Sequence, residues 1–169
     1  MPGVEATELT ELAAGVYCLL EATNLGVLRA DGGRAILVDT GLDESKARRA
    51  WKATRELGLE PAWVLNTHAH ADHFGGNAAL VRRFGVQVGS PPVEAATVRW
   101  PLLEPLSLFG GAWPPAPLRG KFLMAEPSPV HLVLVPGVLE LEGVELRVVP
   151  LPGHSPGQVG ILVKGVFFS

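Results

Sequence analysis

The chain has 169 residues, of which 47% are hydrophobic and 18% charged, and its formal net charge is -3 at pH 7. This length fits a single domain over residues 1–169. No apolar run approaches the roughly eighteen residues needed to cross a bilayer. The negative net charge offers no general basic field for nucleic acid. The only cysteine, Cys18, excludes an intrachain disulfide and a thiolate-rich zinc site, and its apolar neighbours indicate a packed strand residue.

The amino-terminal segment carries Glu5, Glu8 and Glu11 and lacks a basic start followed by a compact apolar core. It does not resemble a secretion signal, so we expect a cytoplasmic protein. Two arginine pairs, Arg48-Arg49 and Arg82-Arg83, are interpreted as solvated helix faces rather than as nucleic-acid contacts.

The first half of the chain is expected to alternate strands with a helix. Short apolar runs bounded by turns predict strands over residues 16–20, 25–28, 35–38 and 62–65. Asp43 fits the N-cap of an amphipathic helix that ends near Gly58. Asp39 lies at the tip of the 35–38 strand, where it is either a turn and capping residue or a group that supports a nearby metal loop; its position alone favours the capping role.

Four potential metal ligands follow the 62–65 strand within six positions, namely His68, His70, Asp72 and His73. In an extended or loop conformation, side chains two apart point the same way, so His68 and His70 can bind one ion while Asp72 and His73 face a second. Imidazole with carboxylate is typical of catalytic rather than structural metal sites. We therefore predict metal-assisted chemistry; a histidine-rich surface loop is the alternative.

The middle of the chain is predicted to be helical and then irregular. Gly75 and Gly76 precede a second helix, where they either bring the backbone close to a bound ion or simply permit the turn. A short strand is expected over residues 86–88 and a third helix over about 90–100. Prolines interrupt an apolar segment over residues 101–129, which predicts a lid or substrate-contact insertion, with a dimerisation surface or a core cover as alternatives.

The last forty residues return to strands. Runs over residues 131–135, 138–141 and 144–149 resemble a second antiparallel sheet, and two more strands follow at 159–163 and 166–169. His131 has no metal-binding neighbour and is interpreted as an edge or packed histidine. Residues 152–157 form a tight turn of glycines and prolines with His154 at its tip.

Three motifs occur in order along the chain: Asp39-Thr40-Gly41, His68-Ala69-His70-Ala71-Asp72-His73 and Pro152-Gly153-His154-Ser155-Pro156-Gly157. Together they resemble the metallo-β-lactamase superfamily of hydrolases, and the resemblance extends from about residue 16 to 169. It implies an α/β (α+β) fold, a four-layer αββα sandwich whose metal site lies along one edge of the two sheets.

The resemblance also assigns the site residues. It implies that a first metal is bound by His68, His70 and His154 and a second by Asp72 and His73. The metals implied are one or two zinc ions, with iron or manganese as alternatives. Asp72 could position the attacking water or take its proton.

Two further features follow from the same comparison with the family. Asp39 matches an aspartate that supports the histidine loop from behind, which favours that role over capping, and Ser155 stands where many relatives have threonine. In the family, a strand like 166–169 runs into Gly-Asp, whose aspartate bridges the metals. The chain as given ends before that motif, so we expect the C-terminal part of the fold to be missing and the second metal to bind weakly.

The function implied is hydrolysis of a small ester, thioester or lactone by a metal-activated water, as in glyoxalase II-like members. The apolar segment at 101–129 motivates an acyl or aromatic substrate. The alternatives are an iron-dependent oxidoreductase of the same fold, persulfide dioxygenase-like or flavodiiron-like, and a non-catalytic metal-binding or interaction module. We expect a small-molecule substrate, neither nucleic acid nor membrane as partner, and a homo-oligomer if the strand edge at 166–169 pairs with another chain.

Overall fold

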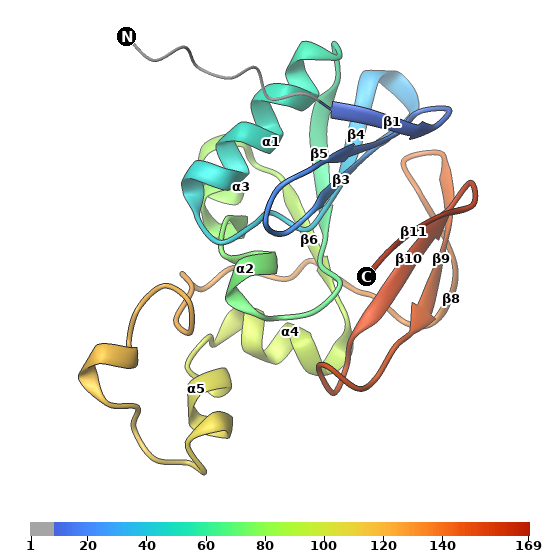
Figure 1. Cartoon of the computed structure of the whole chain (residues 1–169). Coiled ribbons are helices and arrows are strands. Elements are labelled where there is room, and N and C mark those ends of the chain that lie inside the picture. The colour runs from blue at the N-terminus through green and yellow to red at the C-terminus, as the bar shows by residue number, and fades with distance from the viewer. Residues whose placement is uncertain (1–8) are drawn as a thin grey trace, which may run out of the picture.

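Two β-sheets lie face to face, and helices cover the outer face of the first (Figure 1). The computed structural model describes residues 9–169. The sequence interpretation of Glu5 and Glu8 therefore falls outside the described residues. Over residues 9–169, no helix is both long enough and apolar enough to cross a membrane.

The first sheet has seven strands: β1 (Leu9–Ala13), β2 (Val16–Leu19), β3 (Leu25–Arg29), β4 (Arg34–Val38), β5 (Glu60–Leu65), β6 (Gln87–Ser90) and β7 (Leu132–Val133). The second has four strands: β8 (Gly137–Leu141), β9 (Val144–Pro150), β10 (Val159–Val163) and β11 (Val166–Phe168). The α-helices are α1 (Glu44–Glu56), α2 (Ala71–Phe74), α3 (Asn77–Phe84), α4 (Pro92–Arg99) and α5 (Leu103–Leu108). Short 3-10 turns occupy Asp31–Gly33 and Ala116–Leu118.

The strand order explains where a site can form. The first sheet follows the order β1 to β7, antiparallel from β1 to β4 and parallel from β4 to β7. The carboxyl ends of β4, β5 and β6 therefore meet at one edge of the sheet, where open parallel sheets bind ligands. Most of the predicted strands are confirmed, and β1 is an additional strand.

One strand lies in a different sheet from the one predicted. The run over residues 131–135 contains β7, which pairs in parallel with β6 and extends the first sheet instead of joining the second. Leu134 follows this strand and is buried against Gly89, whose missing side chain leaves the room. An apolar run shows that a segment is extended but not which edge it pairs with, so the sequence could not assign this partner.

The core consists of two apolar layers on either side of the first sheet. Between the sheets, Ile36 and Leu65 of the first pack in one cluster with Leu146 and Ile161 of the second. On the other face, strand residues pack against α1 and α3. Along β9, buried and exposed residues alternate, as expected for a sheet with one face in the core. The described residues thus form three layers in the order helix, sheet, sheet, and the α/β class is confirmed.

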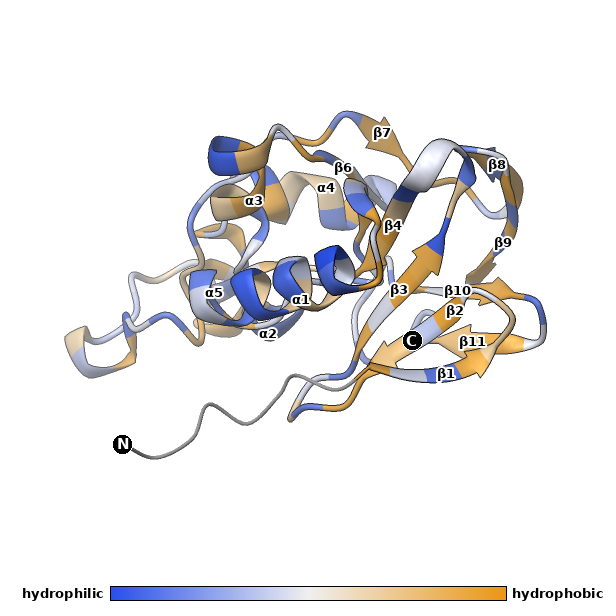
Figure 2. Ribbon diagram, turned by 90° about the horizontal axis from the view of Figure 1, so that it is seen from above, coloured by the Kyte–Doolittle hydropathy of each residue, from blue (hydrophilic) through white to orange (hydrophobic). Residues whose placement is uncertain are grey.

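Helix α1 forms as the sequence indicates. The Asp43 side chain accepts hydrogen bonds from the backbone N–H groups of Ser45 and Lys46, which caps the helix start. Ala47, Ala50 and Thr54 are buried against the sheet, while the outward face is polar (Figure 2). Small residues on the inner face let the helix lie close to the strands.

Gly75 and Gly76 permit close packing of the turn between α2 and α3. A Cβ added to Gly75 would lie 2.0 Å from the carbonyl oxygen of Leu42, and one added to Gly76 would lie 2.4 Å from the Cβ of Ala47. The turn between α2 and α3 therefore presses directly on the start of α1 and on the loop before it. Only glycine permits this approach.

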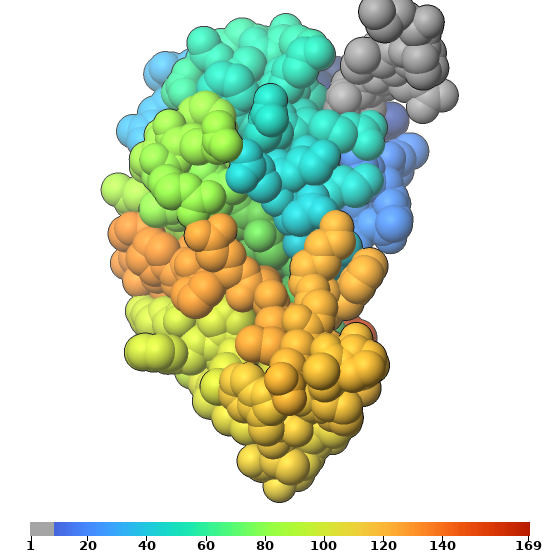
Figure 3. Space-filling view, turned by 90° about the vertical axis from the view of Figure 1, so that its left-hand side faces the viewer, coloured from blue at the N-terminus to red at the C-terminus, as the bar shows by residue number. Residues whose placement is uncertain are grey.

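The segment over residues 101–129 contains a helix that the sequence did not predict. Pro105 suggested a break, but it is the third residue of α5, where a missing N–H group costs no intrahelical hydrogen bond. The segment projects from the two sheets (Figures 1 and 3). Trp100, just before it, and Leu108, Trp113 and Phe122 within it are exposed.

Candidate metal centre

The site lies where loops from both sheets meet. His68 and His70 follow β5, and His154 lies on the loop between β9 and β10. The start of β10 is joined to the loop after β5 by the Val159 N–H group, which donates to the Thr67 carbonyl at 2.9 Å. The ligand nitrogens of the three histidines all lie within 4.8 Å of one another.

His68 has the chemical character of a metal ligand. Its Nδ1 lies 3.1 Å from the Thr67 hydroxyl, while its Nε2 is buried and has no hydrogen-bond partner among the described residues. Burial, together with the nearby His73, lowers the pKa of His68 to about 3, so the ring is neutral. A buried, neutral imidazole with an unpaired nitrogen fits a bound metal, because an unsatisfied polar atom is otherwise costly.

The pKa of His70 is lowered as well. Burial and the neighbouring His154 lower the pKa of His70 against the opposing charges of Asp72 and Glu94. The neutral form is the one that binds metal. Over residues 9–169, no hydrogen bond joins His68, His70 and His154 to one another, although their ligand nitrogens lie within 4.8 Å.

Asp39 connects the first sheet to the histidine loop. Its Oδ1 accepts from the Thr67 N–H group at 2.9 Å, and its Oδ2 accepts from the Thr67 hydroxyl at 2.8 Å and lies 2.8 Å from His73 Nδ1. Asp39 also adopts a left-handed backbone, with φ at 60°. It is therefore both a turn residue and the partner of the loop that carries the histidines.

His73 lies beside His68, with ring centroids 3.9 Å apart, and also beside Asp72. Burial disfavours the charged ring of His73, but its hydrogen bond to Asp39 and the charges of Asp39 and Asp72 together raise its pKa. Because Nδ1 faces Asp39, Nε2 faces Asp72, whose Oδ2 is 3.7 Å away. Thr23 donates to the same oxygen of Asp72 at 3.0 Å. Thr23 and Thr67 are two orienting residues that the sequence did not single out.

Two glutamates at the site were also not identified from the sequence. Glu94 of α4 is only 4% exposed and accepts hydrogen bonds from both histidine-bearing loops. Glu104 of α5 has its Oε1 4.0 Å from His70 Nε2, and burial, together with the charges of Asp72 and Glu94, raises its pKa to about 7. Helical spacing could have indicated Glu94, since it lies one turn before the buried Val98.

Two cavities are lined by candidate site residues. One of about 310 Å³ is bounded by His70, His154 and both of these glutamates, with Leu103 and Leu108 of α5 on its wall. The other, of about 280 Å³, includes Thr23, Asp72, Lys46 and Phe122. Residues from the 101–129 segment thus line both cavities.

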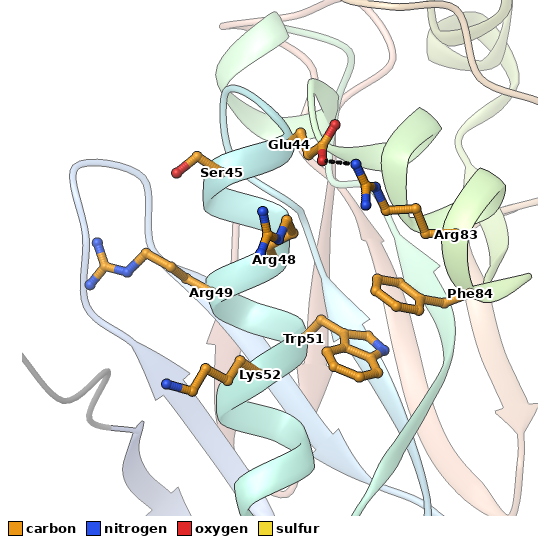
Figure 4. Close-up of a pocket in the computed structure, with 8 residues that line it drawn as sticks. All are labelled: Glu44, Ser45, Arg48, Arg49, Trp51, Lys52, Arg83 and Phe84. Carbon is orange, nitrogen blue, oxygen red and sulfur yellow. Dashed lines mark ion pairs between the residues drawn. The ribbon is translucent and has the colours of Figure 1, made fainter. Parts of the chain in front are cut away.

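A cavity of about 680 Å³, larger than either of these two, lies away from this site on the outer face of α1 and α3 (Figure 4). Trp51 stacks on Phe84 there with ring centroids 4.2 Å apart, and Arg83 pairs with Glu44 at 2.6 Å. No histidine lines it. The two arginine pairs, Arg48-Arg49 and Arg82-Arg83, are exposed, as the sequence predicted. His131 is exposed as well, with its Nδ1 accepting from the Val88 N–H group at 3.0 Å.

Lowering the pH is expected to destabilise the metal-free chain through His68. Its pKa is 6.5 in the unfolded chain and about 3 in the folded one, so the unfolded chain takes up the proton first as the pH falls below about 6.5. At pH 5 this linkage removes about 2 kcal/mol from the free energy of unfolding. His73 acts in the opposite direction, because its raised pKa favours the folded chain at low pH.

Urea unfolding at pH 7 and pH 5 measures this effect by comparing the parent with His68→Gln. Glutamine cannot gain a proton, so the variant is expected to lose less stability between the two pH values. An equal loss in both proteins would contradict the assignment of a neutral, buried His68.

The geometry agrees with comparisons to known proteins. The sequence profile of the Metallo-beta-lactamase superfamily matches residues 19–169. The hydroxyacylglutathione hydrolase of Anaeromyxobacter dehalogenans is 36% identical over 136 residues, which are 80% of this chain and 40% of that protein. The hydroxyacylglutathione hydrolase of Xanthomonas euvesicatoria is 35% identical over 84% of this chain and 43% of that protein.

A solved structure has the same fold. The FEZ-1 metallo-beta-lactamase of Legionella gormanii superposes with a TM-score of 0.76 at 17% identity, over 99% of this chain and 63% of that one. The chain spans less than half the length of the two hydroxyacylglutathione hydrolases. The profile match covers most of the chain, and the chain belongs to the metallo-beta-lactamase superfamily.

Proposed function

We propose that the chain is a metal-dependent hydrolase of small acyl thioesters. The observation that carries the proposal is the set of three histidines whose ligand nitrogens lie within 4.8 Å of one another, two of them on the wall of a cavity. The two curated relatives above, both named hydroxyacylglutathione hydrolase, support a thioester as the substrate class.

The metal would be held by side chains whose free nitrogens or oxygens face one another. His68, His70 and His154 would hold the first ion, and Asp72 and His73 the second. Zinc suits the three-histidine set, with its fourth position open. When bound, the metal lowers the pKa of water towards 7 and so supplies a nucleophile at neutral pH.

The chain's own residues orient the reaction. Asp72 is fixed by Thr23 and, with its side chain 49% exposed, can take or position a proton at Oδ2. The cavity beside His70 and His154 would take the acyl group, since Leu103 and Leu108 provide apolar contacts. No lysine or arginine lines that cavity and two glutamates do, so a neutral acyl group fits better than an anionic one.

The test is thiol release from a hydroxyacyl thioester of glutathione by the purified chain loaded with zinc. We expect release to require the metal, and His70→Ala to reduce the turnover by at least about 100-fold, because His70 supplies one of three ligands. Metal-loaded parent chain that released no thiol, or a His70→Ala variant that matched the parent, would contradict the proposal. Oxygen consumption on a persulfide by an iron-loaded chain would favour the oxidoreductase alternative.

A further inference from the structure

Glu94 is a buried carboxylate that touches both loops carrying the histidines. The backbone N–H group of Ala69, between the first two histidines, donates to its Oε2 at 2.9 Å. On the other loop, the Gly157 N–H group donates to Oε1 at 2.8 Å, and the Ser155 hydroxyl donates to the same oxygen. Each oxygen of the carboxylate therefore serves a different loop.

The three hydrogen-bond partners of Glu94 are those expected for an ionised carboxylate. All three partners are donors, and an ionised carboxylate is a group that only accepts. A charge that is only 4% exposed is retained where such hydrogen bonds compensate its loss of water. Glu94 also opposes the lowering of the His70 pKa that burial produces, so its charge reaches the site.

Gly157 shows how closely the second loop approaches α4. A Cβ added there would lie 2.9 Å from the Cβ of Val93 and 3.0 Å from Oε1 of Glu94. The loop backbone thus rests directly on the helix. The same helix is joined to the first loop only through the other carboxylate oxygen of Glu94, among the hydrogen bonds of the described residues.

We propose that Glu94 is a positioning residue that sets the separation between the His68–His70 loop and the His154 loop. By fixing both loops before metal arrives, it preorganises the three-histidine site and raises its affinity for a divalent cation. The inference rests on the proposed function only in that the three histidines bind metal. Its experiment measures binding without any substrate.

The experiment titrates the metal-free 169-residue chain with Co²⁺ and follows the visible absorption of the ion, while a competing chelator sets the range in which the affinity is measured. In Glu94→Gln the amide can accept from Ser155 and Gly157 only by turning its NH₂ group towards the Ala69 N–H group, so the first loop is released. We expect the affinity to fall by about 10- to 100-fold. The absorption intensity per bound ion is expected to change, because the angles between the ligands change.

Ser155→Ala separates positioning from charge, because it keeps the carboxylate and removes one donor. We expect a loss of roughly 3- to 10-fold in Co²⁺ affinity, the size of one hydrogen bond. Glu126→Gln is the control for net charge, since Glu126 is exposed and lies in none of these contacts. This control is expected to match the parent in affinity and spectrum.

The possible outcomes separate the two ideas. A parent chain that bound no Co²⁺ would overturn both the proposed function and this inference. A parent that bound, with Glu94→Gln identical in affinity and spectrum, would overturn the inference alone. An unchanged Co²⁺ affinity in Ser155→Ala would also overturn the inference, since the effect of Glu94→Gln would then be one of charge. If circular dichroism showed that metal-free Glu94→Gln did not fold, the affinity of Ser155→Ala would decide.

Discussion

Replacing His154 by alanine is expected to abolish the first metal site while leaving the fold intact. His154 is exposed on a loop of the second sheet, so its removal creates no buried cavity. Two histidines would remain, and we expect zinc affinity to fall by roughly 1000-fold, beyond the 10–100-fold that a lost supporting contact costs. Zinc titration against a chelator measures the affinity, and thiol release is expected to fall with it.

His131→Ala is the matched control. It removes another exposed histidine, one that bonds the Val88 backbone and lies outside the three-histidine set. It is expected to keep the parent's zinc affinity. Equal affinities in His154→Ala and the parent would show that the loop between β9 and β10 supplies no ligand.

Gly75→Ala is expected to destabilise the chain by more than about 3 kcal/mol, at the upper end of what an overpacked core costs. The added Cβ would lie 2.0 Å from the Leu42 carbonyl oxygen and 2.5 Å from that of Ala71. Both neighbours are backbone atoms, so the clash cannot be relieved by a rotamer change. The helix pair would have to move off the loop before α1.

Urea unfolding of the metal-free chain measures the effect, with Gly120→Ala as control. A Cβ on Gly120 would meet nothing within 4 Å, and its φ lies outside the left-handed region. This control is expected to be neutral or slightly stabilising. A loss below about 1 kcal/mol in Gly75→Ala would contradict the packing role of Gly75.

The local part of the candidate site is apparent in the sequence. His68, His70, Asp72 and His73 lie within six positions, so the conformation of a short loop decides their arrangement. His154 is marked by the glycines and prolines that force a turn around it. The position of Asp39 at a strand tip favoured a turn role and the family resemblance favoured support of the histidine loop, and the structure shows both a left-handed turn and hydrogen bonds to that loop.

The non-local part could not be predicted in this way. Glu94 has partners 25 and 61 positions away, so helical spacing could indicate its burial but not which loops it contacts. The membership of β7 in the first sheet depends on where the 101–129 segment returns the chain. The helix α5 was not predicted because Pro105 suggested a break, whereas a proline in the first turn of a helix is tolerated.

The division of the histidines between the two sheets has a mechanical consequence. His68 and His70 extend from the first sheet and His154 from the second, with a long stretch of chain between them. An ion held by all three would act as a reversible cross-link that lowers the entropy of the separated sheets. Hydrogen exchange in β9 and β10 would then slow on metal loading, so the metal content would report how firmly the two halves of the sandwich are joined.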